Sequence, residues 1–139
     1  MSEIIRKLCL WIPPVVLVKD RVFDVQAVKG SSMAPTLQAG DWLLVWKMIS
    51  EKPEFPTCQV LPNSLVVFAS PISEKWQRLV KRVVSVRNGQ SGSRNFLTVA
   101  GDNKESSVDS RVFGEINDGL VEGVVIGVCF PPWRMRSFI

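Results

Sequence analysis

Two adjacent serines lie in a segment, GSSMAPTL at positions 30–37, that suits either a nucleophile or an ordinary turn. The segment separates two runs that read as strands, and Gly40-Asp41 follows it. A serine on such a tight connection can expose its Oγ, and neighbouring backbone N–H groups can stabilise the oxyanion that forms when a carbonyl is attacked. Ser, Pro and Gly are also the common residues of turns. Taken alone, the segment leaves both interpretations open.

A lysine that could serve as a base occurs in the run LVKRVV at positions 79–84. Because side chains alternate along a strand, Lys81 shares a face with Leu79 and Val83, and Arg82 lies on the other face. One of the two cations must therefore point into apolar surroundings or be covered by another group. Burial lowers the pKa of a lysine, whereas an arginine is not deprotonated in proteins. Lys81 is thus the candidate base; the alternative is an edge-strand lysine that discourages aggregation.

A third polar segment, GDNKESSVDSR at positions 101–111, directly follows another run that reads as a strand. Its residues favour turns, and Asp109 and Arg111 are close enough along the chain to pair. A solvated loop with hydroxyl-capped turns would have the same composition. For this segment too, the functional and the structural interpretation both stand when it is taken alone.

The chain of 139 residues contains no histidine, which excludes several common catalytic arrangements. A Ser-His-Asp triad, a Cys-His dyad and an imidazole metal site all require that residue. The three cysteines, Cys9, Cys58 and Cys129, are far apart and odd in number, so neither a disulfide framework nor a zinc site is indicated. A general base must then be a lysine, a carboxylate or a metal-bound water. We expect no metal and no cofactor.

Net charge gives little support for a nucleic-acid partner. The formal charge is +4, but Lys and Arg occur singly or in pairs such as Lys81-Arg82, with no aromatic residues interleaved. Direct binding of nucleic acid usually needs a clustered basic surface. Hydrophobic residues make up 46% of the chain, too many for a disordered protein. The length suits one domain.

The elements that must position these residues are short runs of β type. Each run is bounded by Gly, Pro, Asn or Asp, as strands are. The runs are Val22–Val28, Trp42–Trp46, Leu65–Phe68, Leu79–Val86, Phe96–Val99 and Val124–Phe130. Helical periodicity is absent beyond the N-terminus. The pattern predicts an all-β domain, a small antiparallel barrel or sandwich, with a proline-rich surface loop over Met48–Asn63.

The N-terminus holds an uncharged apolar run, LCLWIPPVVLV, from Leu8 to Val18. A membrane-spanning helix needs about 20 apolar residues. This run is shorter, and Pro13-Pro14 interrupts it. Arg6 and Lys7 precede it. A membrane anchor or uncleaved sorting signal and a buried or interfacial segment are both consistent with this hydropathy.

The three polar segments together resemble the type I signal peptidase family. SMAPTL followed by GD is similar to the motif that holds the family's nucleophile, VKRVV to the motif with its lysine base, and GDNKESSVDSR to its third signature. The order and approximate spacing also agree. Asp20-Arg21-Val22, upstream of the serines, and Phe130-Pro131-Pro132 make the chain most similar to mitochondrial members. The resemblance runs from about Val15 to Trp133.

This resemblance implies roles for individual residues and the absence of others. Ser32 corresponds to the nucleophile, Lys81 to the base, Ser107 to the hydroxyl that orients the lysine, Asp109 and Arg111 to a structural ion pair, and Asp102 to a residue of the same signature. Many bacterial members have a serine where this chain has Gly30, and its hydroxyl assists the oxyanion hole. The Pro-Gly-Asp that often follows the lysine motif is replaced by SVRNGQ, and an extra β-domain is absent.

The resemblance also implies a function and a location. We expect residues 1–21 to form a short hydrophobic anchor or sorting segment and residues 22–139 a Ser/Lys catalytic domain. The implied activity is that of a membrane-bound serine endopeptidase of the mitochondrial inner membrane, with its catalytic domain facing the intermembrane space. Its substrates would be precursor proteins with cleavable sorting sequences. A second protease subunit is expected as a partner, and no nucleic acid.

Three rival interpretations remain at this point. The chain could be a weakly active or inactive subunit that keeps the fold and stabilises a partner protease. It could be a self-cleaving repressor-type protease, which also uses a Ser/Lys pair, but there is no room for a DNA-binding helical domain. It could be a basic nucleic-acid-binding barrel, but no stacking platform of aromatic residues is evident.

Overall fold

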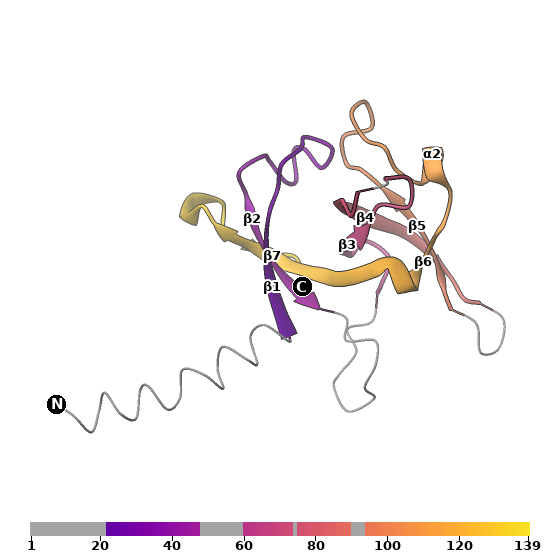
Figure 1. Ribbon diagram of the computed structural model, residues 1–139. Helices are drawn as coiled ribbons and strands as arrows, with labels where there is room; N and C mark the ends of the chain where they lie inside the picture. The colour runs from indigo at the N-terminus through magenta and orange to yellow at the C-terminus, as the bar shows by residue number, and fades with distance from the viewer. Residues whose placement is uncertain (1–21, 48–59, 74, 90–93) are drawn as a thin grey trace, which may run out of the picture.

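The computed structural model describes residues 22–47, 60–73, 75–89 and 94–139, which fold around one antiparallel β-sheet (Figure 1). The strands are β1 (Phe23–Ala27), β2 (Trp42–Lys47), β3 (Leu65–Ala69), β4 (Arg78–Arg87), β5 (Phe96–Ala100), β6 (Ile116–Asn117), β7 (Val121–Phe130) and β8 (Arg136–Ser137). Their order in the sheet is β1-β2-β7-β3-β4-β5-β6, and β8 pairs with β7. The predicted all-β class is confirmed.

Strand β3 lies at the centre of the packing because its run LVVFA is apolar throughout and all five residues are buried. Alternating side chains of this strand enter two hydrophobic clusters on opposite faces of the sheet. The first cluster contains Met33, Leu37, Leu43, Val45, Leu65, Val67, Val125 and Val128. The second contains Val66, Phe68, Val83, Leu97, Val99, Ile116, Val121 and Val124. Strands β3 and β7 therefore join both clusters into one domain.

The sheet is not closed between β1 and the first half of β4. Strand β1 stands at one end of the strand order, and in the described part of the chain it pairs only with β2. Residues 78–81 of β4 pair with β3, whereas pairing with β5 begins at Arg82. A groove of about 710 Å³ lies between these two strand edges. Gly30, Ser32 and Met33 of the serine segment are among its lining residues.

The structure adds short elements that the sequence pattern does not contain. Strands β6 and β8 have two residues each, too few to show an alternation. Helix α2 (Ser110–Phe113) has a single turn and begins where the Asp109 side chain accepts a hydrogen bond from the Arg111 N–H. The 3-10 helices Asp118–Leu120 and Pro132–Arg134 are equally short. Capping hydrogen bonds and strand pairing fix the positions of these short elements, and the periodicity of hydrophobic residues does not indicate them.

Two predictions lie largely or wholly outside the described residues. The N-terminal segment, residues 1–21, is one of them, and the proline-rich loop predicted over Met48–Asn63 is described only from Val60 onward. A search of the described residues finds no helix with the length and apolar character needed to cross a bilayer.

Candidate active site

Lys81 occupies a buried position in the middle of β4. Its side chain is on the face of the second hydrophobic cluster, opposite Val66 of β3 and on the same side as Val83. Only 2% of its surface is exposed. Burial is the main influence on this amine and lowers the pKa of Lys81 below its ordinary value; the nearby Asp109 carboxylate opposes that shift, and the Arg111 cation adds to it. Burial therefore shifts the protonation equilibrium of Lys81 toward the neutral amine.

The Lys81 amine is held by a serine hydroxyl rather than by a carboxylate. Its Nζ donates to Ser107 Oγ at 2.9 Å, and Ser107 Oγ donates to Asp109 Oδ2 at 3.0 Å. A hydroxyl has one proton to donate and lone pairs to accept with. Because Ser107 gives its proton to Asp109, it presents a lone pair to Lys81. That arrangement uses one N–H of the Lys81 side chain, so in the neutral form of the amine the nitrogen lone pair is free to point elsewhere.

Asp109 anchors this chain of hydrogen bonds and is itself fully buried. Besides Ser107, its carboxylate accepts from Gly101 N at 3.0 Å, from Arg111 N at 3.1 Å, and from Arg111 Nε and Nη2 at 2.9 and 2.8 Å. The Arg111 guanidinium is the main cause that holds the pKa of Asp109 far below its usual range. The negative charge of Asp109 is thus neutralised by Arg111 rather than by Lys81.

Arg82, the neighbouring cation on β4, points to the opposite face and has its own carboxylate. Its Nε and Nη2 donate to the two oxygens of Asp102 at 2.9 and 2.7 Å, and Nη1 donates to the carbonyl of Asn63 at 3.0 Å. The sequence left open which cation would be buried and which covered. In the structure Lys81 is buried and Arg82 is covered by Asp102, so Asp102 is directed to Arg82 and not to the Lys81 amine.

Ser32 lies on the connection between β1 and β2, against the loop that carries Ser107. Its carbonyl accepts from Asn103 N at 2.9 Å. The two loops approach each other at Gly101, where a Cβ would lie 2.0 Å from Ser107 Oγ and 2.7 Å from the Ser32 carbonyl oxygen. Only glycine fits this contact without displacing backbone. The close approach places Ser32 beside the residue that holds Lys81.

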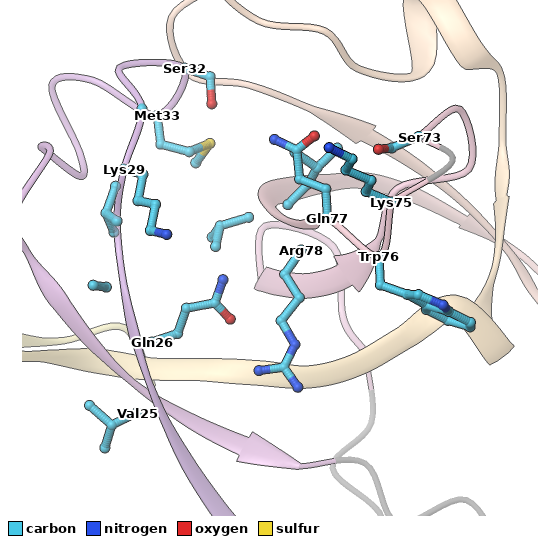
Figure 2. Close-up of a pocket in the computed structure, with 15 residues that line it drawn as sticks. Val25, Gln26, Lys29, Ser32, Met33, Ser73, Lys75, Trp76, Gln77 and Arg78 are labelled. Carbon is cyan, nitrogen blue, oxygen red and sulfur yellow. The ribbon is translucent and has the colours of Figure 1, made fainter.

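The Ser32 hydroxyl is directed into the groove, as Figure 2 shows. Among the described residues, no hydrogen bond joins Ser32 Oγ to Lys81 Nζ. Catalytic hydrogen bonds are often long in ligand-free enzymes and shorten when substrate binds. Ser31 is different: its hydroxyl faces Ser106 Oγ at 3.2 Å on the exposed side of the same connection. The two adjacent serines therefore have distinct environments, and only Ser32 lines the groove.

Apolar packing and a buried ion pair hold the connection between β1 and β2, which carries Ser32, in place. Met33 and Leu37 are buried in the first cluster. Asp41, 2% exposed, accepts from Gln38 N at 2.9 Å and from Arg134 at 2.7 and 2.9 Å. Arg134 is the main cause that lowers the pKa of Asp41. Sequence reasoning missed this pair because its members lie far apart in the chain, and no local pattern connects them.

The groove itself was also not predicted from the sequence. One wall is formed by residues 25–30 of β1 and the following turn, and the other by residues 75–80 at the start of β4 (Figure 2). Each wall presents a strand edge, so an extended peptide could pair with it through backbone hydrogen bonds. In the parts of the chain that the structure describes, no group of three metal-binding side chains is found.

Comparison with known proteins gives a consistent set of relatives. Residues 1–91 match the family model described as signal peptidase, peptidase S26, and this range includes Ser32 and Lys81. Mitochondrial inner membrane protease subunit 2 of Saccharomyces cerevisiae is 30% identical over 142 residues, covering 89% of this chain and 77% of the relative. The human subunit 2 is 28% identical, covering 91% and 78%. Subunit 1 of Schizosaccharomyces pombe is 30% identical, covering 82% and 78%.

Replacing Asp109 by asparagine should destabilise the domain, because five hydrogen bonds to a buried carboxylate would be lost or weakened. We expect the free energy of unfolding at neutral pH to fall by about 2 kcal/mol or more. The contribution of Asp109 is complete above the unfolded-state pKa of about 3.9 and is lost as the pH falls through the lowered folded-state pKa. The difference between wild type and Asp109→Asn should therefore shrink below about pH 4. Urea unfolding across pH measures it, with exposed Glu105→Gln as the control; a constant difference down to acid pH would contradict this account.

Proposed function

This chain belongs to the signal peptidase family, peptidase S26, and is a peptidase of that type; from this premise we propose that Ser32 is its nucleophile and Lys81 its general base. The observation that carries the proposal is the burial of Lys81 without a carboxylate of its own. A buried ammonium is costly unless it is paired. Asp109 is already paired with Arg111, so burial shifts Lys81 toward the neutral amine, the form that accepts a proton.

The proposed reaction uses groups of this chain at each step. Neutral Lys81 takes the proton from Ser32 Oγ as that oxygen attacks the scissile carbonyl. The backbone N–H of Ser32 stabilises the oxyanion, and no side-chain hydroxyl assists at position 30, which is glycine. Lys81 then gives the proton to the leaving amine. Lys81 next takes a proton from a water molecule that attacks the acyl-enzyme ester, and it returns this proton to Ser32 Oγ as the ester C–O bond breaks. Ser107 keeps the amine in place throughout.

We further propose that the substrate binds as an extended strand in the groove. Within the described residues, strand β1 and the first half of β4 each have one edge without a strand partner, and these edges form its two walls. A peptide added to such an edge gains affinity from main-chain hydrogen bonds, while shallow pockets accept alternate side chains. Family resemblance implies small residues near the cut. The substrates would be precursor proteins whose sorting sequences are removed by cleavage.

The relatives provide the basis for a proposed location and assembly. Several of them are named as subunits 1 and 2 of mitochondrial inner membrane proteases. We propose that this chain is likewise a subunit of a protease of the mitochondrial inner membrane. Its catalytic domain, residues 22–139, would face the intermembrane space, and residues 1–21 would anchor it. A second protease subunit would be its partner.

Ser32→Ala should abolish cleavage of a presequence-bearing precursor while leaving the fold intact. Loss of a nucleophile that works together with its base typically costs about 10⁴- to 10⁶-fold in rate. Ser31→Ala is the matched control, because its hydroxyl faces the exposed Ser106 and not the groove; we expect a loss of about tenfold or less. Purified full-length protein in detergent, with and without a candidate partner subunit, serves for the assay. Equal activity of wild type and Ser32→Ala would refute the proposed nucleophile.

Lys81→Arg should be nearly as inactive as Lys81→Ala, because a guanidinium stays protonated above pH 12 and has no lone pair to accept a proton. Wild-type activity should rise with pH through the lowered pKa of Lys81, since only the neutral amine is a base. Single-turnover cleavage from neutral to alkaline pH measures both effects, with circular dichroism to verify folding. A folded Lys81→Arg protein with nearly wild-type turnover would show that the residue supplies charge and not a proton acceptor.

The N-terminal segment should keep the protein in the membrane fraction after carbonate extraction of mitochondria. The reason is the apolar run at Leu8–Val18, preceded by Arg6 and Lys7. Replacing Leu10 and Leu17 by aspartate should release the protein, because a carboxylate in the bilayer core costs about 2.5 to 3.5 kcal/mol per residue. Quantitative release of the wild-type chain would instead indicate peripheral attachment.

A further inference from the structure

The groove has an uneven distribution of charge along its length. Among the residues that the structure describes, three cations line it, Lys29, Lys75 and Arg78, and none of these lining residues is a carboxylate. The other arginines near the site are each matched by an acid, Arg82 by Asp102 and Arg111 by Asp109. Counted over the described lining residues, the groove therefore carries more positive than negative charge.

Arg78 is neutralised by two acidic residues at the end of the groove away from Ser32. Its Nη1 contacts Asp24 Oδ2 of β1 at 3.0 Å, and its Nε contacts Glu122 Oε2 of β7 at 2.6 Å. Figure 2 shows the Arg78 side chain directed away from Ser32 and toward β7. Two carboxylates face this one guanidinium, so this end of the groove has no excess of positive charge, and the Arg78–Asp24 ion pair bridges its two walls.

Lys29 and Lys75 are the cations left at the Ser32 end. Lys29 precedes Ser32 by three residues on one wall, and Lys75 extends from the other wall (Figure 2). No ion pair joins either lysine to a carboxylate within the described ranges of the chain. Both are exposed, and the groove lining also includes the apolar residues Val28, Met33 and Val80. Apolar walls strengthen the field that a nearby charge exerts on an occupant of the groove.

We propose that Lys29 and Lys75 select substrates with an acidic side chain within a few residues of the scissile bond. This inference rests on the proposed binding of an extended peptide in the groove, and it specifies the chemical class of one substrate side chain. A carboxylate carried into the Ser32 end of the groove would meet two ammonium groups from opposite walls. At the other end it would meet Arg78, whose charge is already matched by Asp24 and Glu122.

Peptide binding to the full-length Ser32→Ala protein in detergent tests this proposal without requiring cleavage. The probes are short peptides of Ala, Ser and Leu that carry a single Asp at each position in turn, each with a matched Asn peptide. At one or two neighbouring positions we expect the Asp peptide to bind about fivefold tighter than its Asn partner at low salt. The preference should disappear in about 0.5 M NaCl, because exposed charges are then screened.

Two groove variants and one control separate charge recognition from general binding. In the double variant Lys29→Gln/Lys75→Gln, the Asp and Asn peptides should bind with equal dissociation constants, a ratio of about 1. In the double variant Lys29→Glu/Lys75→Glu, a Lys peptide should bind tighter than the Asp peptide. Arg136→Gln removes an exposed cation on β8, outside the groove, and should keep the wild-type ratio. Equal binding of Asp and Asn peptides at every position, or a preference that survives loss of both lysines, would overturn the proposal.

Cleavage by the wild-type protein, measured with the same peptides, distinguishes this inference from the proposed function. Faster cleavage of the Asp peptide at the position that binds tighter supports both. Tighter binding of Asp peptides by Ser32→Ala protein, without cleavage of any peptide by wild type, supports the charge selection and counts against the peptidase mechanism. Cleavage of Asp and Asn peptides at equal rates, with equal binding, supports the mechanism and overturns the selection.

Discussion

The burial of a lysine amine without a negative partner is the constraint on which the site depends. An ammonium at the position of Lys81 would be surrounded by Val66 and Val83, and the nearest acid, Asp109, is already neutralised by Arg111. The fold therefore uses Asp109 to orient Ser107, and uses Ser107 to orient the amine. The charged groups, Asp109 and Arg111, lie at the end of this series of hydrogen bonds that is farthest from the amine. The Lys81 amine can therefore lose its proton while Ser107 keeps it in position.

The same arrangement explains why two loops far apart in sequence must meet closely. The loop with Ser107 descends from β5, and the connection with Ser32 joins β1 to β2. Gly101 lets the two backbones approach to a distance that any side chain would prevent. The buried pair of Asp41 and Arg134 and the packing of Leu37 fix the other side of the serine connection. The proposed nucleophile and base are thus positioned by their own contacts with Asn103 and Ser107 and by the packing of neighbouring residues.

The sequence pattern predicted those features that depend on residues close together in the chain, namely the strands and the direction of their side chains. Alternation along Leu79–Val83 indicated that Lys81 and Arg82 face opposite ways, and the apolar runs located the six longer strands to within a few residues. The pairs that complete the site, Arg82 with Asp102, Arg134 with Asp41 and Arg78 with Asp24, join residues 20 to 93 positions apart. Such pairs leave no periodic signal in one sequence. The groove is likewise a property of strand order, because it exists only where β1 and β4 fail to meet.

The pairing of β4 with β3 has a consequence for the fidelity of assembly. Lys81 stands opposite Val66, and Arg82 stands opposite Leu65. A slip of a single residue between these strands would move every side chain of β4 to the other face. The Arg82 guanidinium would then occupy the place of the Lys81 amine, and a chain folded in this way would lack the proposed general base. The unbroken apolar character of β3, buried on both faces, penalises that slip because it would bring Arg82 into the core. Strand β3 contributes no reactive group, but its burial helps to fix the register in which β4 pairs with it.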